Sequence, residues 1–209
     1  MFPTGCNFAI VFNYDFILLV ILMDLPDRKK NRLDNFDYGQ NGSYFVTLCT
    51  QNRKQIFEIE PLPVGNDILV VPQKNTHKNP CLQNQIIHKW VKITEKKFPN
   101  IKFDKYVIMP DHLHFIVFIF NGIIDVDKER HIGRSLHDAM RFFKTMTTNE
   151  YIKCVKYNLL PSFDKKLWQK SYYDHIIRNQ HDYDETWEYI DNNPINWILK
   201  HQKQDQMNI

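Results

Sequence analysis

Two histidines separated by one apolar residue, His112-Leu113-His114, are the sharpest chemical signal in the 209-residue sequence. They begin an apolar run that is typical of a β-strand, and successive side chains of a strand point to opposite faces. We therefore expect His112 and His114 to share one face while Leu113 faces the other. Such a pair could chelate a divalent cation if a third ligand comes from elsewhere. Taken alone, however, two histidines at this spacing are more often ordinary structural residues.

A second signal lies in a predicted helix that begins after an N-cap at Asn179, runs through Asn192 and stops before Pro194. Tyr189 lies off the apolar stripe of this helix, and Asn193, one turn later, shares its side. The stripe itself comprises Tyr183, Trp187 and Ile190. The pattern therefore places a phenol and an amide on one edge. The alternative interpretation is a half-exposed packing tyrosine followed by a helix cap.

Together the two signals suggest attack on a phosphodiester. A tyrosine oxygen that attacks phosphorus needs a cation to polarise the phosphate and to stabilise the departing 3′-oxygen. Two imidazoles with an amide or carboxylate oxygen could hold that cation. Such mixed ligation suits Mg²⁺ or Mn²⁺, with Mn²⁺ the more natural partner for imidazole, and zinc is not excluded.

The remaining pattern predicts the elements that must position these residues. β-Branched and aromatic runs indicate strands, and apolar residues at helical spacing indicate helices. Residues 58–82 contain several prolines, which favours a loop with one small strand. The predicted elements are a strand at 43–50, a helix at 83–98, two strands at 101–109 and 112–120, a helix at 135–157, an extended segment at 167–177, and the last helix. This order predicts an α+β fold with a ferredoxin-like split βαβ antiparallel sheet, helices on one face, and a C-terminal helix that carries the tyrosine.

The composition is that of a packed protein of one main domain. Hydrophobic residues make up 43% and charged residues 24%, which excludes a disordered, collagenous or membrane-bundle chain. The net charge is only +3, so binding to an acidic partner requires a local basic patch. We expect an N-terminal extension at 1–27, disordered or preceding the natural start, a catalytic domain at 28–200 and a polar tail at 201–209.

The cellular setting is predicted from two absences in the sequence. The four cysteines show neither metal-knuckle nor disulfide spacing, which indicates a reducing cytoplasm. The apolar run at 16–23 is too short to span a bilayer, so we expect no membrane partner.

Three blocks of the sequence resemble, in order, those of REP-associated tyrosine transposases, a branch of the single-tyrosine insertion-sequence transposases with a His-hydrophobic-His metal motif. The blocks are RLDNFDYGQNGSYFVTLCTQNRKQIF, YVIMPDHLHFIVFI and LWQKSYYDHIIRNQHDYDETWEYIDNNPINW, and the resemblance spans about residues 28–197. It implies a ferredoxin-like fold and cleavage of single-stranded DNA through a 5′-phosphotyrosine that leaves a free 3′-OH. It also implies that His112 and His114 bind the metal, Tyr189 is the nucleophile and Asn193 completes the site. Asp111 departs from the Asn or Glu common in relatives, and we expect it to cap the turn rather than to add charge near the metal.

Candidate DNA contacts follow from charge and aromaticity. Basic side chains could contact phosphate, although each could equally be a solvated surface residue. These are Arg28, Lys29, Lys30, Arg32, Arg141, Lys144, His175 and Arg178. Three aromatic residues, Trp168, Tyr172 and Tyr173, could stack on unpaired bases, but aromatics in such a segment more often belong to a core.

The predicted function is therefore a metal-dependent endonuclease and strand transferase acting on single-stranded or hairpin DNA. Its cofactor would be Mg²⁺ or Mn²⁺, and no glycine-rich nucleotide-binding loop is present. One alternative is a hairpin-binding protein of the same fold without cleavage. Another is a metal-dependent phosphodiester hydrolase in which water attacks. We expect a monomer rather than a homodimer, located in the cytoplasm and nucleoid-associated when bound to DNA.

Overall fold

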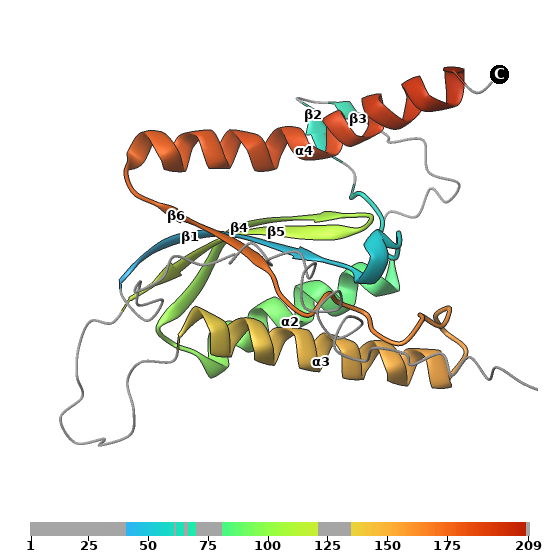
Figure 1. Ribbon diagram of the computed structural model, residues 1–209, viewed down its shortest axis with the longest axis horizontal. Helices are drawn as coiled ribbons and strands as arrows, with labels where there is room; N and C mark the ends of the chain where they lie inside the picture. Colours follow the sequence, from blue (N-terminus) through green and yellow to red (C-terminus); the bar gives the residue numbers. More distant parts are fainter. Residues whose placement is uncertain (1–40, 61, 65–66, 70–80, 121–134, 208–209) are drawn as a thin grey trace, which may run out of the picture. The chain divides into compact units, whose positions relative to one another are not determined.

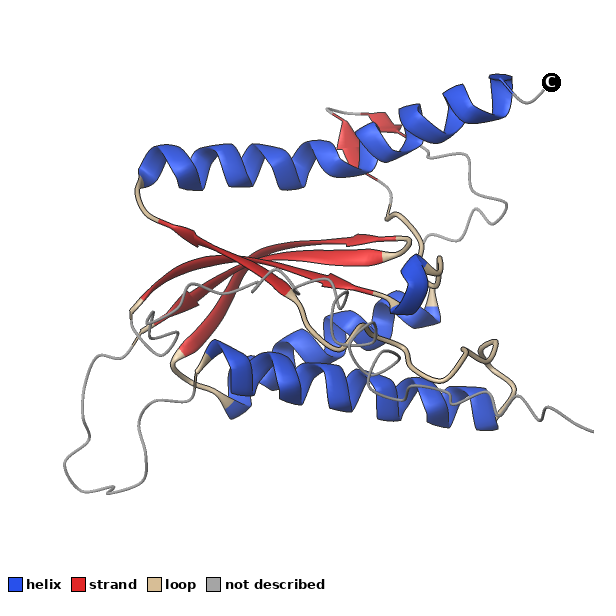
Figure 2. Cartoon of the chain, viewed as in Figure 1, coloured by secondary structure: helices blue, strands red, loops and turns tan. Residues whose placement is uncertain are grey.

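The computed structural model describes residues 41–60, 62–64, 67–69, 81–120 and 135–207, and these residues form an α+β fold around one antiparallel sheet (Figures 1 and 2). The four strands of the sheet lie in the order β4-β5-β1-β6. They are β1 (Gly42–Cys49), β4 (Ile101–Met109), β5 (His112–Ile119) and β6 (Tyr173–Ile177). A short 3-10 turn (Gln51–Arg53) follows β1, and β2 (Leu62–Val64) pairs with β3 (Asp67–Leu69) in a separate hairpin. The predicted order of the main strands and helices is confirmed, whereas the region at 58–82, expected to hold one small strand, contains the two short strands of this hairpin.

Helices cover both faces of the sheet (Figure 1). The helices α2 (Leu82–Lys97) and α3 (Leu136–Lys156) pack on one face, and α4 (Gln180–Met207) lies over the other. The prediction of helices on one face with a separate C-terminal helix is thereby confirmed. Among the described residues, no helix combines the length and the apolarity that crossing a bilayer requires.

Successive side chains along β1 and β5 alternate between the two faces of the sheet. Tyr44, Val46 and Leu48 are fully buried towards α2 and α3, together with Phe115 of β5. The intervening residues face α4, as a strand's period of two requires. The antiparallel register pairs Thr47 with His114. The middle strands therefore carry a hydrophobic core on one face and the predicted histidines on the other.

The helix α4 differs from its prediction at its end. Asn179 caps its start as expected, because the Asp182 amide donates to the Asn179 Oδ1 at 2.9 Å. The helix does not stop before Pro194, however, but continues to Met207. Proline removes one backbone hydrogen bond, yet the buried ring of Pro194 packs towards β4, which offsets that loss. Figure 1 shows that α4 bends along its length, and residues 201–207, predicted to begin a polar tail, continue this helix.

The extended segment predicted at 167–177 forms a regular strand only over Tyr173–Ile177, with a single bridge between Trp168 and Thr50 before it. The predicted N-terminal extension at 1–27 lies outside the described residues.

Candidate functional site

The two histidines of β5 meet on the face that α4 covers. The Nε2 atoms of His112 and His114 are 3.0 Å apart, and their side chains are almost fully buried. Leu113 points into the core on the opposite face. The prediction that the pair shares one face is therefore confirmed.

The other nitrogen of each ring is engaged by a protein group. The Nδ1 of His112 lies 2.5 Å from the Asp111 Oδ1, and the Nδ1 of His114 lies 2.8 Å from the Thr47 Oγ1. The second carboxylate oxygen of Asp111 is 3.6 Å from the Arg53 guanidinium. The expectation that Asp111 serves the turn is wrong, because its carboxylate orients His112 and adds negative charge beside the pair. Both Nε2 atoms are left to face each other.

His114 is held in its neutral form. Burial of the ring, and to a smaller extent His112 and Arg53, lower its pKa from 6.5 to about 3. At neutral pH this imidazole therefore keeps a nitrogen lone pair, which is the form that binds a metal ion.

Tyr189 of α4 lies against the histidine pair of the same chain. Its ring meets the His114 ring edge to face, with centroids 5.3 Å apart. Phe45 stacks on His114 at 5.0 Å and also contacts the Tyr189 ring at 5.8 Å. The tyrosine nevertheless remains 52% exposed, so part of its side chain faces solvent.

The position of Asn193 follows from the helical spacing. Tyr189, Asn193 and Trp197 recur every fourth residue and share one side of α4. The first contacts His114, and the last lies 6.0 Å from the His112 ring. Asn193 therefore lies between them on the stripe that faces the histidine pair. All four residues predicted to form the site thus lie on β5 and the adjoining side of α4.

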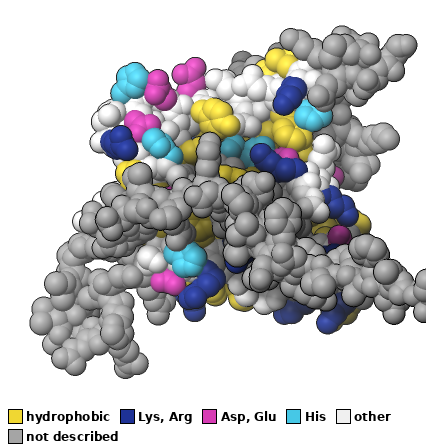
Figure 3. Space-filling view, in the orientation of Figure 1, with side chains coloured by type: hydrophobic (Ala, Val, Ile, Leu, Met, Phe, Trp, Pro, Cys, Tyr) yellow, Lys and Arg dark blue, Asp and Glu magenta, His cyan; other side chains and the backbone are white. Residues whose placement is uncertain are grey.

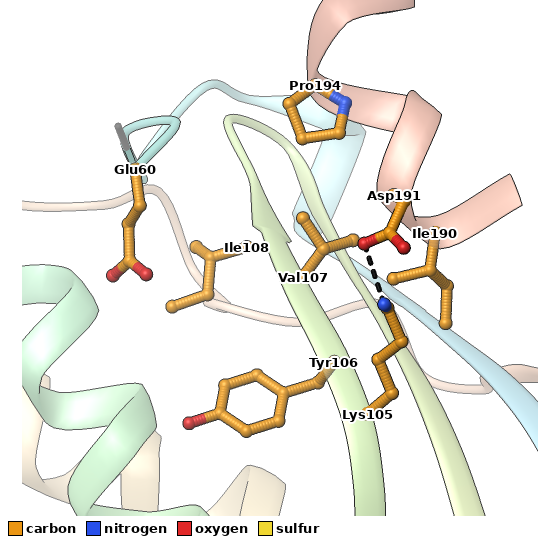
Figure 4. A pocket seen from close by; sticks show the side chains of 8 residues that line it. All are labelled: Glu60, Lys105, Tyr106, Val107, Ile108, Ile190, Asp191 and Pro194. Carbon is orange, nitrogen blue, oxygen red and sulfur yellow. Dashed lines mark ion pairs between the residues drawn. The ribbon is translucent and has the colours of Figure 1, made fainter. Parts of the chain in front are cut away.

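A small set of contacts fixes α4 to the sheet. Ile190 is buried against Ile116 and Ile177, and the Tyr183 hydroxyl donates to Asp104 at 2.5 Å. On a different side of α4 from Tyr189, a cavity of about 160 Å³ lies between this helix and β4. Figure 4 shows the Lys105–Asp191 ion pair, 2.6 Å long, that bridges the two elements there. These contacts hold α4 against the sheet and thereby fix the position of Tyr189 relative to the histidine pair.

The donor set fits a divalent cation with open coordination positions. Two ligands about 2.1 Å from one ion, at about a right angle, are about 3.0 Å apart, which matches the separation of the two Nε2 atoms. Within the described part of the chain, no group of three His, Cys, Asp or Glu side chains is close enough to enclose an ion. Asn193, water or the substrate would have to supply the remaining ligands.

The predicted basic contacts are dispersed. Arg28, Lys29, Lys30 and Arg32 lie outside the described residues. Arg141 and Lys144 belong to α3, across the sheet from the histidines, where Arg141 pairs with Asp138. The Lys144 ammonium donates to two backbone carbonyls, and burial lowers its pKa. The structure does not bring these two side chains to the candidate site, and their contact with DNA stays a prediction.

His175 and Arg178 lie nearer to the site. His175 is the cross-strand partner of Phe45, so it lies on the same face as His114. Its Nε2 is 3.1 Å from the Asp182 carboxylate, and the Arg178 amide donates to that carboxylate. In Figure 3, basic, acidic and histidine side chains are interspersed over the part of the surface where α4 lies.

The candidate stacking aromatics separate into two groups. Trp168 and Tyr172 are buried in the core beneath the sheet, which confirms the core interpretation for these two residues and excludes base stacking. Tyr173 is 53% exposed and is the cross-strand partner of Thr47. It therefore lies on the face of the histidine pair, two strands from β5.

Several residues of the site were not predicted. Thr47 is 67 positions from His114, and only the strand register brings them together. The helical spacing from Tyr189 could have indicated Trp197. A helix predicted to stop before Pro194, however, does not include that residue. Phe45 gave no signal beyond that of an ordinary strand residue.

The sequence of this chain is similar to that of a bacterial protein. No protein-family model matches the sequence. A protein of Haemophilus influenzae strain Rd, described as uncharacterized, is 30% identical over 191 residues, which cover 86% of this chain and 92% of that protein. The chain belongs to the family of that Haemophilus protein.

Solved structures identify the fold. The structure of a REP-associated tyrosine transposase bound to a REP hairpin aligns with a TM-score of 0.50 and 20% identity, covering 79% of this chain and 72% of that one. A candidate transposase from Deinococcus radiodurans R1 aligns with a TM-score of 0.41 and 14% identity, covering 77% of this chain and 97% of that one. The resemblance to REP-associated tyrosine transposases is confirmed at the level of the fold, which this chain shares with the first structure.

Proposed function

We propose that this chain is a metal-dependent tyrosine transposase that cleaves and rejoins single-stranded DNA next to a hairpin. The observation that carries the proposal is the contact of the Tyr189 ring with His114, whose Nε2 faces that of His112. A tyrosine and a two-histidine chelate on one sheet face are the groups that nucleophilic cleavage of a phosphodiester requires.

In the proposed reaction, the Tyr189 hydroxyl oxygen attacks the scissile phosphorus. The new bond joins phosphorus to the phenolic oxygen, the bond to the 3′-oxygen breaks, and the phenolic proton leaves with solvent. The covalent 5′-phosphotyrosine conserves the energy of the broken bond, so a 3′-OH can later displace the tyrosine without ATP. The exposure of Tyr189 supports this role, because a DNA strand must reach its oxygen.

His112, His114 and Asn193 would hold the divalent cation. When bound, Mg²⁺ or Mn²⁺ would polarise the phosphate and stabilise the charge on the leaving oxygen. The hydrogen bonds that the two imidazole rings make with Asp111 and Thr47 hold the rings with their Nε2 atoms converging. Burial of both rings excludes water from the side of the site that faces the sheet.

The proposed partner is hairpin DNA, and the proposed state is a monomer. The transposase with the same fold was solved bound to a REP hairpin, which supports a hairpin as the substrate class. Tyr189 lies against the histidines of its own chain, which supports a site that is complete without a second copy.

A cleavage assay with a matched tyrosine control tests the proposal. The substrate is a labelled DNA hairpin with a single-stranded flank, incubated with Mg²⁺ or Mn²⁺. We expect wild type and Tyr157→Phe, altered at an exposed tyrosine that caps the C-terminus of α3, to cut and to form an SDS-stable adduct. We expect Tyr189→Phe to do neither.

Each other outcome overturns a part of the proposal. Equal cutting by wild type and Tyr189→Phe would exclude this nucleophile. Cutting without an adduct would indicate a hydrolase that uses water. Binding without any cutting, by either protein, would indicate a hairpin-binding protein.

A further inference from the structure

The histidine pair lies in a continuous row of hydrogen-bonding groups. The row runs from the Thr47 hydroxyl to His114, then to His112 and finally to the Asp111 carboxylate. A neutral imidazole carries its single proton on either Nδ1 or Nε2, and each neighbour in the row restricts that choice. The order of donors and acceptors can therefore be worked out from the Asp111 end.

Asp111 fixes the state of His112. A carboxylate only accepts hydrogen bonds, so the Nδ1 of His112 must carry the proton and donate to it. The Nε2 of His112 is then bare. Since this atom lies 3.0 Å from the Nε2 of His114, without a cation the favourable arrangement is donation from His114 to His112.

That arrangement determines what Thr47 does. If the Nε2 of His114 carries the proton, its Nδ1 is bare and accepts from the Thr47 hydroxyl at 2.8 Å. In this tautomer a proton occupies the space between the two Nε2 atoms in which a cation would bind.

Two bare Nε2 atoms require the other tautomer of His114. Its Nε2 proton passes to solvent and its Nδ1 takes one from solvent, so the imidazole stays neutral and protons balance. The Thr47 hydroxyl can then accept from Nδ1 by rotating its O–H bond, because a hydroxyl is both donor and acceptor. A backbone carbonyl or amide in its place would favour only one state.

We propose that Thr47 is a positioning residue whose hydroxyl lets His114 exchange between a proton-filled tautomer and a tautomer that receives a divalent cation. His112, in contrast, is held in one tautomer by Asp111. The two histidines of the pair thus have different tasks, one constant and one exchangeable. This inference rests on the proposed metal role of the pair.

The test measures metal binding without DNA. The probe is Mn²⁺ alone, and its dissociation constant is measured by calorimetry for wild type, Thr47→Val and Thr47→Ser. The control is Thr148→Val in α3, whose hydroxyl donates to the Lys144 carbonyl of its own helix, across the sheet from the histidine pair. We expect Thr47→Val to weaken Mn²⁺ binding about 10- to 100-fold, as is usual for loss of a hydrogen bond to a ligating histidine. Thr47→Ser and Thr148→Val should bind like wild type.

A second readout uses wild-type protein alone, so it does not require any variant to fold. The ¹⁵N chemical shifts of the His114 ring in wild type report which nitrogen carries the proton. We expect the proton on Nε2 in the metal-free protein and on Nδ1 after addition of Zn²⁺ as a diamagnetic probe. A proton on Nδ1 in both forms, or equal Mn²⁺ affinity of Thr47→Val and wild type, would overturn the inference.

The failure of this inference is separable from failure of the proposed function. If His114→Ala loses Mn²⁺ binding while Thr47→Val retains it, only the role of Thr47 is wrong. If His114→Ala binds Mn²⁺ like wild type, the metal role of the histidines is itself wrong.

Discussion

The two faces of the central sheet differ in what covers them. On the face of α2 and α3, aliphatic and aromatic side chains form one continuous buried core. On the face of α4, the buried cluster of the described residues is small and comprises Ile116, Ile177 and Ile190, and beside it lie the histidine pair and a half-exposed tyrosine. One face therefore supplies most of the apolar burial that stabilises the fold, and the other carries the polar residues of the candidate site.

The strand β5 belongs to both faces, so neighbouring residues of one strand should behave differently. Phe115 points into the core, and His114 points towards α4. If this division is correct, substitutions one position apart should separate stability from chemistry.

The largest expected effect is on catalysis. We expect His114→Gln to lower the rate of DNA cleavage about 10³-fold or more, because a cation that stabilises the transition state is worth several kcal/mol. Cleavage of the labelled hairpin under single-turnover conditions measures this loss. A change of less than tenfold would show that the α4 face does not carry the chemistry.

The next effect is on stability. We expect Phe115→Ala to lower the free energy of unfolding by about 3–5 kcal/mol, because it removes a fully buried ring and leaves a cavity. Urea denaturation measures it, with His114→Gln as the neighbouring comparison. Equal destabilisation by both substitutions would contradict the division between the faces.

The histidine should also make stability depend on pH when no cation is present. In the folded chain the pKa of His114 is about 3 instead of 6.5, so between these values the unfolded chain binds the additional proton. Stability is therefore complete above pH 6.5 and falls as the pH decreases towards 3, by up to ~1.4 kcal/mol per pH unit. Denaturation series over this range should be flatter for His114→Gln than for wild type. Equal slopes for the two proteins would contradict the burial of a neutral His114.

The smallest effect concerns substrate binding beside the site. Tyr173 is exposed on the face of the histidine pair, and Tyr157 is exposed at the end of α3. We expect Tyr173→Ala to weaken binding of single-stranded DNA by about 1–3 kcal/mol, the usual value of one stacked base. Fluorescence anisotropy would measure it. Equal binding by Tyr173→Ala and Tyr157→Ala would show that Tyr173 does not stack on a base.

The sequence predicted features that follow from local periodicity. The alternation along β5 gave the common face of His112 and His114, and the helical step placed Tyr189 and Asn193 on one side of α4. Periodicity cannot give the register between strands, so the Thr47–His114 hydrogen bond was not predictable. It also cannot weigh a local preference against packing, which is why the helix was expected to stop at Pro194 although the buried proline continues it.

The direct test is to identify the residue that becomes attached to DNA. Wild-type protein is reacted with the hairpin substrate and Mn²⁺, digested with protease and nuclease, and analysed by peptide mass spectrometry. We predict a nucleotide linked through its 5′-phosphate to Tyr189, the residue whose ring lies 5.3 Å from His114. Attachment to any other residue, or cleaved DNA with a free 5′-phosphate and no modified peptide, would contradict the proposed active site.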